Sequence, residues 1–132
     1  MIGIDTNILV RLLVADSPEQ ATAARVLIDE AEARGEKVFI NRLVLAECLW
    51  VLASQYRANK TDAMSAVEKL ADHPAFLLEN RNAWKEAAAI ARKSRQEMVD
   101  QVVAATNAEK GCDITFTFDR IAARSSRFKL LS

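Results

Sequence analysis

The sequence predicts a single α/β domain, a three-layer α/β/α sandwich around a central parallel sheet. Short apolar runs alternate with longer segments of helical periodicity, and this order favours parallel strands because each connecting helix must cover one face of the sheet. Apolar residues make up 51% of the 132 residues, enough for one core. No repeat or linker divides the chain, so residues 1–132 are expected to form one domain.

Five short apolar runs are expected to form the strands. They are Ile2–Ile4, Val38–Ile40, Ala75–Leu78, Ile114–Phe118 and Phe128–Leu131. Helical spacing between them predicts helices from about residue 8 and over about 18–34, 42–56, 61–71 and 98–110, with a short helix near 121–124 and another helix marked by Trp84, Ala87, Ala88 and Ala91. Ser17 and Gln20 form the pattern of a capping box, Pro18 suits the first helical position, and Gly35 is a stop signal.

Charge and cysteine content exclude several classes of protein. Eighteen basic and 18 acidic side chains cancel, so any nucleic-acid binding requires a locally basic face. Cys48 and Cys112 lie in apolar stretches without a CxxC motif, which favours small buried hydrophobic residues over a disulfide or zinc site. The N-terminus lacks a secretory pattern and no apolar run is long enough to span a membrane, so a cytoplasmic protein is expected.

Four acidic residues stand out by position. Asp5 and Asp119 directly follow predicted strands, where open α/β sheets bind ligands. Glu47 interrupts an otherwise apolar run, 43–52, which predicts a buried helix and a carboxylate that needs a partner. Asp100 lies near the start of its helix. Each also has a structural interpretation: Asp5 as a helix cap, Glu47 as a buried ion-pair partner, Asp100 and Asp119 as helix-start acids.

A parallel sheet with crossover helices can bring these four acids to one edge. Converging carboxylates repel one another unless a cation neutralises them, and all-oxygen ligands favour Mg²⁺, with Mn²⁺ as a substitute. Such an ion activates water against phosphate esters. Phosphodiester hydrolysis is therefore a candidate reaction.

These residues resemble a PIN-domain protein, and more narrowly the VapC-like ribonuclease toxins of type II toxin–antitoxin modules. The resemblance runs in order from Met1 to Leu131. It rests on the opening Ile4-Asp5-Thr6-Asn7, the helix bearing Glu47, the run from Asp100 to Ala105 and the ending from Thr115 to Arg120. Two positions depart from the family pattern: Glu97 stands where the family often has aspartate, and Gln101 where it has a small residue.

The resemblance implies an α/β/α fold, an acidic Mg²⁺-dependent site and endonucleolytic cleavage of RNA. It also implies a homodimer and inhibition by a small antitoxin protein. Asp5 and Asp100 would be metal ligands and catalytic residues, with Glu47 and Asp119 completing the catalytic acids. Supporting polar groups would be Thr6, Asn7, Glu97 and Thr117.

Arginines near the predicted site are candidates for phosphate contacts. They are Arg42, Arg95 and Arg120, with Arg124 close by. For a partner, we hypothesise that the helix with Leu49 and Trp50 combines with apolar residues of the next helix in a groove for an antitoxin helix or a second copy. The residues expected there are Ala63, Met64, Val67 and Leu70.

The same residues are compatible with other functions. A metal-dependent DNA nuclease would share the acidic chemistry, and a catalytically silent PIN-type module would bind RNA without cutting it. A haloacid-dehalogenase-like phosphatase also uses an early strand-end aspartate. Its usual second aspartate, two residues later, is Asn7 here, which counts against that class.

Overall fold

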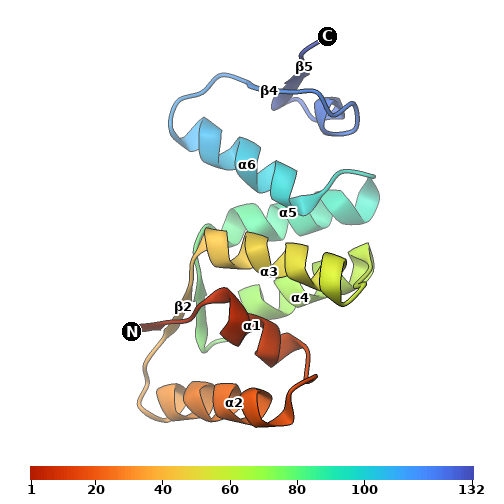
Figure 1. Cartoon of the computed structure of the whole chain (residues 1–132). Coiled ribbons are helices and arrows are strands. Elements are labelled where there is room, and N and C mark those ends of the chain that lie inside the picture. The colour runs from red at the N-terminus through yellow and green to blue at the C-terminus, as the bar shows by residue number, and fades with distance from the viewer. The chain divides into compact units, whose positions relative to one another are not determined.

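A computed structural model describes residues 1–132 and confirms a mixed α/β fold with parallel strands (Figure 1). The chain divides into two compact units, residues 1–81 and 82–132. The first contains β1 (Ile2–Gly3), α1 (Thr6–Leu13), α2 (Pro18–Ala33), β2 (Val38–Ile40), α3 (Arg42–Gln55), α4 (Lys60–Asp72) and β3 (Phe76–Leu78). The second contains α5 (Arg81–Lys93, with Arg81 still in the first unit), α6 (Met98–Glu109), β4 (Thr115–Thr117), the 3₁₀ helix η1 (Ala122–Arg124) and β5 (Phe128–Leu130).

The first unit has a three-stranded parallel sheet in the order β1-β2-β3. Ile2 pairs with Val38, which in turn pairs with Phe76. Helices α1 and α2 connect β1 to β2, and α3 and α4 connect β2 to β3, as parallel neighbours require. The carboxyl ends of all three strands therefore meet at one edge of this sheet.

Side chains from this sheet and its helices form the core of the first unit. Leu9 of α1 and Leu45 of α3 are fully buried, in keeping with the direct packing of α1 against α3. Cys48 is buried as expected, and its burial raises the pKa of the thiol to about 12. It therefore stays a neutral thiol at physiological pH.

In the second unit, α6 leads into a two-stranded parallel sheet of β4 and β5. Gly111 ends α6 with a φ of +94°, as its sequence position predicts. Asn107 Nδ2 donates a hydrogen bond to Thr115 Oγ1 at 3.0 Å, which ties the end of α6 to β4. Ala104, Ala122 and Phe128 pack together as a small apolar cluster.

The expected burial of Cys112 is wrong. Cys112 is exposed because it follows the Gly111 turn at the surface. In the edge strand β3, Leu77 is 45% exposed whereas Leu78 is buried, because neighbouring side chains of a strand face opposite sides of the sheet. None of the helices has the length and apolar character that crossing a membrane demands.

The expected capping box at the start of α2 does not form. Ser17 is the N-cap and Pro18 opens the helix, but the Ser17 side chain accepts no capping hydrogen bond. Gln20 is engaged elsewhere, because its Oε1 accepts a hydrogen bond from Arg11 Nε at 2.6 Å. A complete box occurs instead at α4, where the side chains of Asn59 and Asp62 each accept from the other's backbone N–H.

Replacing these two N-caps by alanine should have different effects. Asn59→Ala removes a capping hydrogen bond and should lower the free energy of unfolding by about 1 kcal/mol. Ser17→Ala removes none and should change it by less than about 0.5 kcal/mol. Urea denaturation of both variants measures the difference, and equal losses of stability would contradict a capping bond at Asn59 alone.

Candidate functional site

Three oxygen-bearing side chains follow the strands of the first unit at their carboxyl edge. Asp5, Asn41 and Glu79 each lie two residues beyond the paired row formed by Gly3, Phe39 and Leu77. Asp5 Oδ1 accepts from Ile8 N at 3.0 Å and so caps α1, as its structural interpretation predicts. Asn41 Oδ1 accepts from Val44 N at 2.8 Å and caps α3.

Glu79 is a further carboxylate at this edge, one that the motifs of the sequence do not single out. Its Oε1 accepts from Arg42 N at 2.8 Å, so α3 is capped by two residues from neighbouring strands. The signal that could have found it is the one used for Asp5, since Glu79 also directly follows a strand. Asp5 and Glu79 thus bring two carboxylates to the edge where α1 and α3 begin.

Glu47 is exposed, so its predicted burial is wrong. Helix α3 buries one face, with Leu45, Cys48 and Leu52, and leaves Leu43, Glu47 and Trp50 on the other. Leu43 is 77% and Trp50 65% exposed. An apolar run alone gives no indication of which side of a helix is covered, and here apolar side chains lie on the open side as well. Glu47 is therefore accessible and needs no buried partner.

In the second unit, Asp100 lies near two other acidic residues. Burial raises the pKa of the Asp100 carboxyl, and the negative charges of Asp119 and Glu97 raise it further. Glu97 is the N-cap residue of α6 but its side chain makes no capping bond. The partly buried carboxylate of Asp100 is therefore repelled by the carboxylates of Asp119 and Glu97.

Asp119 is held in a tight turn two residues after the end of β4. Its Oδ1 accepts from Ile121 N at 2.8 Å and from Ala122 N at 3.1 Å. Its own backbone N–H donates to Thr117 Oγ1 at 2.9 Å, so Thr117 supports the turn. The exposed Asp119 side chain thereby has a defined orientation.

The remaining candidate residues have varied positions. Thr6 and Asn7 open α1 directly beyond Asp5, with Thr6 half-buried and Asn7 exposed. Arg42 is half-buried at the start of α3, whereas Arg95 and Arg120 are exposed near α6 and Asp119. The latter two are accessible for contacts with phosphate groups.

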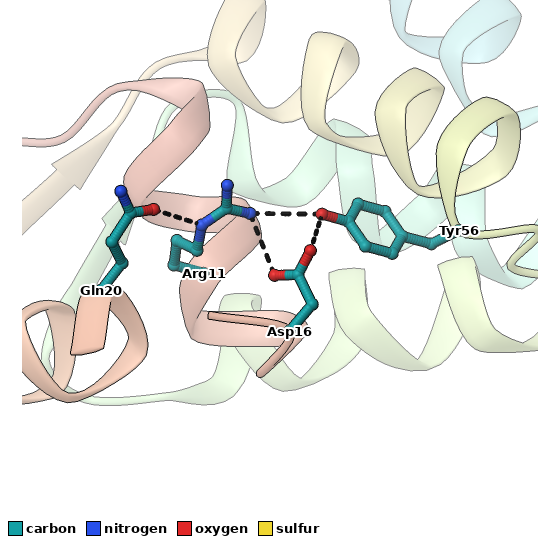
Figure 2. A network of polar contacts seen from close by, with 4 residues as sticks. All are labelled: Arg11, Asp16, Gln20 and Tyr56. Atoms are coloured by element: carbon teal, nitrogen blue, oxygen red, sulfur yellow. Dashed lines mark hydrogen bonds and ion pairs between the residues drawn. The ribbon is translucent and has the colours of Figure 1, made fainter. Parts of the chain in front are cut away.

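A cavity of about 480 Å³ lies beside Asp5, between α1 and α2. It is lined mainly by apolar groups, with Asn7 and Arg11 among the polar ones. Arg11 also belongs to a polar network (Figure 2), in which its Nη1 donates to Asp16 Oδ1 and to Tyr56 OH, both at 3.2 Å, and Tyr56 OH donates to Asp16 Oδ2 at 2.5 Å. The carboxylate of Asp16 neutralises the charge of Arg11. Through its hydrogen bonds to Gln20 and Tyr56, Arg11 links α1 to α2 and to the end of α3.

The donor chemistry fits a hard divalent cation. Asp5 and Glu79 in the first unit, and Asp100, Glu97 and Asp119 in the second, offer carboxylate oxygens, which Mg²⁺ prefers. The elevated pKa of Asp100 also fits, because a cation would relieve the repulsion that causes part of it. Within each unit, no three acidic, histidine or cysteine side chains come close enough to bind one ion by themselves.

Comparison with protein families decides the class of this protein. The model of the PIN domain matches residues 2–127, nearly the whole chain and parts of both units. The chain belongs to the PIN domain family. PIN domains are typically nucleases that use divalent metal ions, so this protein is assigned to a family of metal-dependent phosphodiester hydrolases. Comparison with curated proteins found no match.

The electrostatics of Asp100 predict how stability depends on pH. A carboxyl whose pKa is higher in the folded state stabilises the fold at low pH, and this contribution is lost as the pH rises through the folded-state pKa. Asp100→Asn should therefore leave the thermal midpoint of the metal-free protein unchanged or raise it at pH 7. At pH 3, where Asp100 is protonated, this gain should disappear.

Asp29→Asn, on the exposed face of α2, is the matched control and should show no such pH-dependent gain. Mg²⁺ should raise the midpoint of the wild-type protein more than that of Asp100→Asn. Thermal melts at both pH values, with and without Mg²⁺, measure these effects. A large loss of stability in Asp100→Asn at pH 7 would show a structural role instead.

Proposed function

We propose that this PIN-domain protein is a Mg²⁺-dependent endoribonuclease, with Mn²⁺ as a substitute ion, and the toxin of a type II toxin–antitoxin system acting in the cytoplasm. The observation that carries the proposal is the repulsion of Asp100 by Asp119 and Glu97 in a member of a nuclease family. Keeping like charges together opposes folding, and a cation-dependent reaction is a reason to retain them.

The proposal assigns a role to each acidic residue. Asp5 and Asp100 would be metal ligands, and a bound ion supplies positive charge to activate water and stabilise the phosphate. Glu47 and Asp119 are exposed carboxylates that can accept a proton from, and orient, the attacking water. The turn that fixes Asp119 and the cap that fixes Asp5 limit the motion of both side chains.

Polar and basic neighbours complete the proposed site. Thr6, Asn7, Thr117 and Glu97 each lie within three residues of a proposed catalytic acid and would support it. The cationic side chains of Arg42, Arg95 and Arg120 would contact RNA phosphates. Such contacts depend on salt and do not read sequence by themselves.

Asp5→Asn and Asp100→Asn should each abolish Mg²⁺-dependent cleavage of labelled single-stranded RNA. Each substitution removes a charged ligand while keeping the shape of the side chain, and the amide oxygen that replaces the Asp5 carboxylate can still cap α1. The loss expected is at least about 100-fold in rate, since a bound ion supplies several kcal/mol to the reaction. Asp29→Asn is the control and should cleave like wild type.

The same assay separates the alternative functions. Cleavage of single-stranded DNA but not of RNA would identify a DNA nuclease, and RNA binding without cleavage would identify a silent binding module. Full activity of either variant, or of the wild type in excess EDTA, would contradict the metal mechanism.

The partner proteins are also part of the proposal: an inhibitory antitoxin and a second copy in a homodimer. The hypothesis of a groove shared with α4 needs correction, because Met64, Val67 and Leu70 are buried in the core. Leu43 and Trp50 of α3 are exposed on either side of Glu47. An antitoxin helix that packs on these two apolar side chains would cover Glu47 and so block a catalytic acid.

Induced expression of the wild type should arrest bacterial growth, whereas Asp100→Asn should not. Co-expression of the proposed antitoxin, sought as a short reading frame adjacent to this gene, should restore growth because it would cover the site. A Leu43→Glu, Trp50→Glu double variant should still arrest growth but escape the antitoxin. Rescue of the double variant as efficient as that of wild type would contradict docking on α3, and size-exclusion chromatography with light scattering tests the dimer.

A further inference from the structure

Gln96 and Gln101 are the only buried residues of the chain with amide, hydroxyl or charged side chains, at 7% and 6% exposure. Burying an amide is unfavourable unless it forms hydrogen bonds. Here Gln101 Nε2 donates to Gln96 Oε1 at 3.1 Å, and Gln96 Nε2 donates to the carbonyl oxygen of Ile121 at 3.3 Å. The two side chains thus form a hydrogen-bonded relay inside the second unit.

The relay connects the two segments that carry Asp100 and Asp119. Gln101 is the neighbour of Asp100 in the first turns of α6. Ile121, at the other end, donates its backbone N–H to Asp119 Oδ1 at 2.8 Å. At one end, Gln101 is joined to Asp100 by a peptide bond. At the other end, Ile121 accepts a hydrogen bond from Gln96 and donates one to the Asp119 side chain.

The loop before α6 is itself anchored. Gln96 N donates to Ser94 Oγ at 3.2 Å, and Ser94 Oγ donates to the carbonyl of Ile90 in α5 at 2.7 Å. Gln101 N donates to the carbonyl of Glu97 at 3.3 Å. Gln96 is therefore held through both its backbone and its side chain. Its hydrogen bond to the Ile121 carbonyl can then limit the motion of the Asp119 turn.

We propose that Gln96 and Gln101 are positioning residues that hold the Asp119 turn at a set separation from Asp100. Two like charges move apart if the chain allows it, so a restraint is required to keep them near each other. A buried amide relay suits this task because its hydrogen bonds are directional and competing water is excluded. The consequence for catalysis rests on the proposed function, whereas the restraint itself does not.

Gln96 is the residue whose chemistry is most constrained. It must accept from Gln101 and donate to Ile121 at the same time, which only a side chain with both an acceptor and a donor achieves. The Ile121 carbonyl also accepts from Arg124 N at 3.1 Å, so removing the Gln96 donor leaves this carbonyl with one of its two bonds. Methionine has similar length and neither hydrogen-bonding group.

The test compares Gln96→Met and Gln101→Met with Gln55→Met, an exposed glutamine at the end of α3. Hydrogen exchange at the Ile121 and Ala122 amides reports the Asp119 turn directly, in the metal-free protein. Gln96→Met should accelerate this exchange about fivefold, the effect of losing one hydrogen bond. Gln101→Met should have a smaller effect, because Gln96 keeps its bond to Ile121.

Two further measurements distinguish positioning from a merely structural role. Mn²⁺ affinity, followed by electron paramagnetic resonance, should fall about tenfold in Gln96→Met. The kcat for RNA cleavage should fall by a similar factor while KM stays within about twofold, because substrate contacts are not removed. A lower thermal midpoint with unchanged Mn²⁺ affinity and kcat would overturn the positioning role.

Gln101→Met keeps the proposal testable if Gln96→Met does not fold. Gln101 borders a cavity of about 110 Å³, which leaves room for the new side chain. Exchange at Ile121 and Ala122 that matches wild type in each of the two variants that folds, as in Gln55→Met, would overturn the relay. A wild-type protein that binds no Mn²⁺ and cleaves no RNA would refute the proposed function alone, because the exchange data still decide whether the relay restrains the turn.

Discussion

The repulsion between Asp100 and its acidic neighbours is the constraint on which the second unit depends. Desolvation already disfavours the charge of Asp100, and Asp119 and Glu97 add to this. The N-terminus of α6 offsets part of the cost, since the helix dipole favours negative charge there. Three restraints limit how far the remaining repulsion can separate these charges. They are the Asp119 turn, the hydrogen bond from Gln96 N to Ser94 Oγ, and the hydrogen bond between the two buried glutamines.

Acidic and amide side chains have a structural task as well as a chemical one in this fold. Asp5, Asn41 and Glu79 all accept backbone N–H groups at helix starts, and Asp119 does the same for the turn before η1. A carboxylate has two oxygens, so one can cap a helix while the other faces solvent or a ligand. The structural and functional interpretations of Asp5 are therefore compatible, and the capping bond fixes the side chain for any further role.

Local signals predicted most of the fold. Pro18 and Gly111 mark helix boundaries through fixed backbone preferences, and short apolar runs identified all five strands to within two residues at either end. Properties set by neighbours distant in sequence were harder to predict. The exposure of Glu47 depends on which face of α3 is covered. The capping box at Ser17 is missing because Arg11 binds the Gln20 side chain instead. Glu79 can cap α3 only because strand pairing places β3 beside β2. The sequence predicted only in part which acidic residues lie near one another. The end of a strand indicates where a side chain is attached, but not which side chains surround it.

The departure from the family pattern at Gln101 has a structural explanation. Successive residues on an α-helix point about 100° apart, so the residue after Asp100 has its side chain on a different face. Here that side chain turns into the core, bonds to Gln96 and lies away from solvent. A small residue would leave space and no donor for Gln96 Oε1, and a different restraint would then be needed. Gln101 therefore changes how the segment that carries Asp100 is supported and leaves the Asp100 carboxylate itself unchanged.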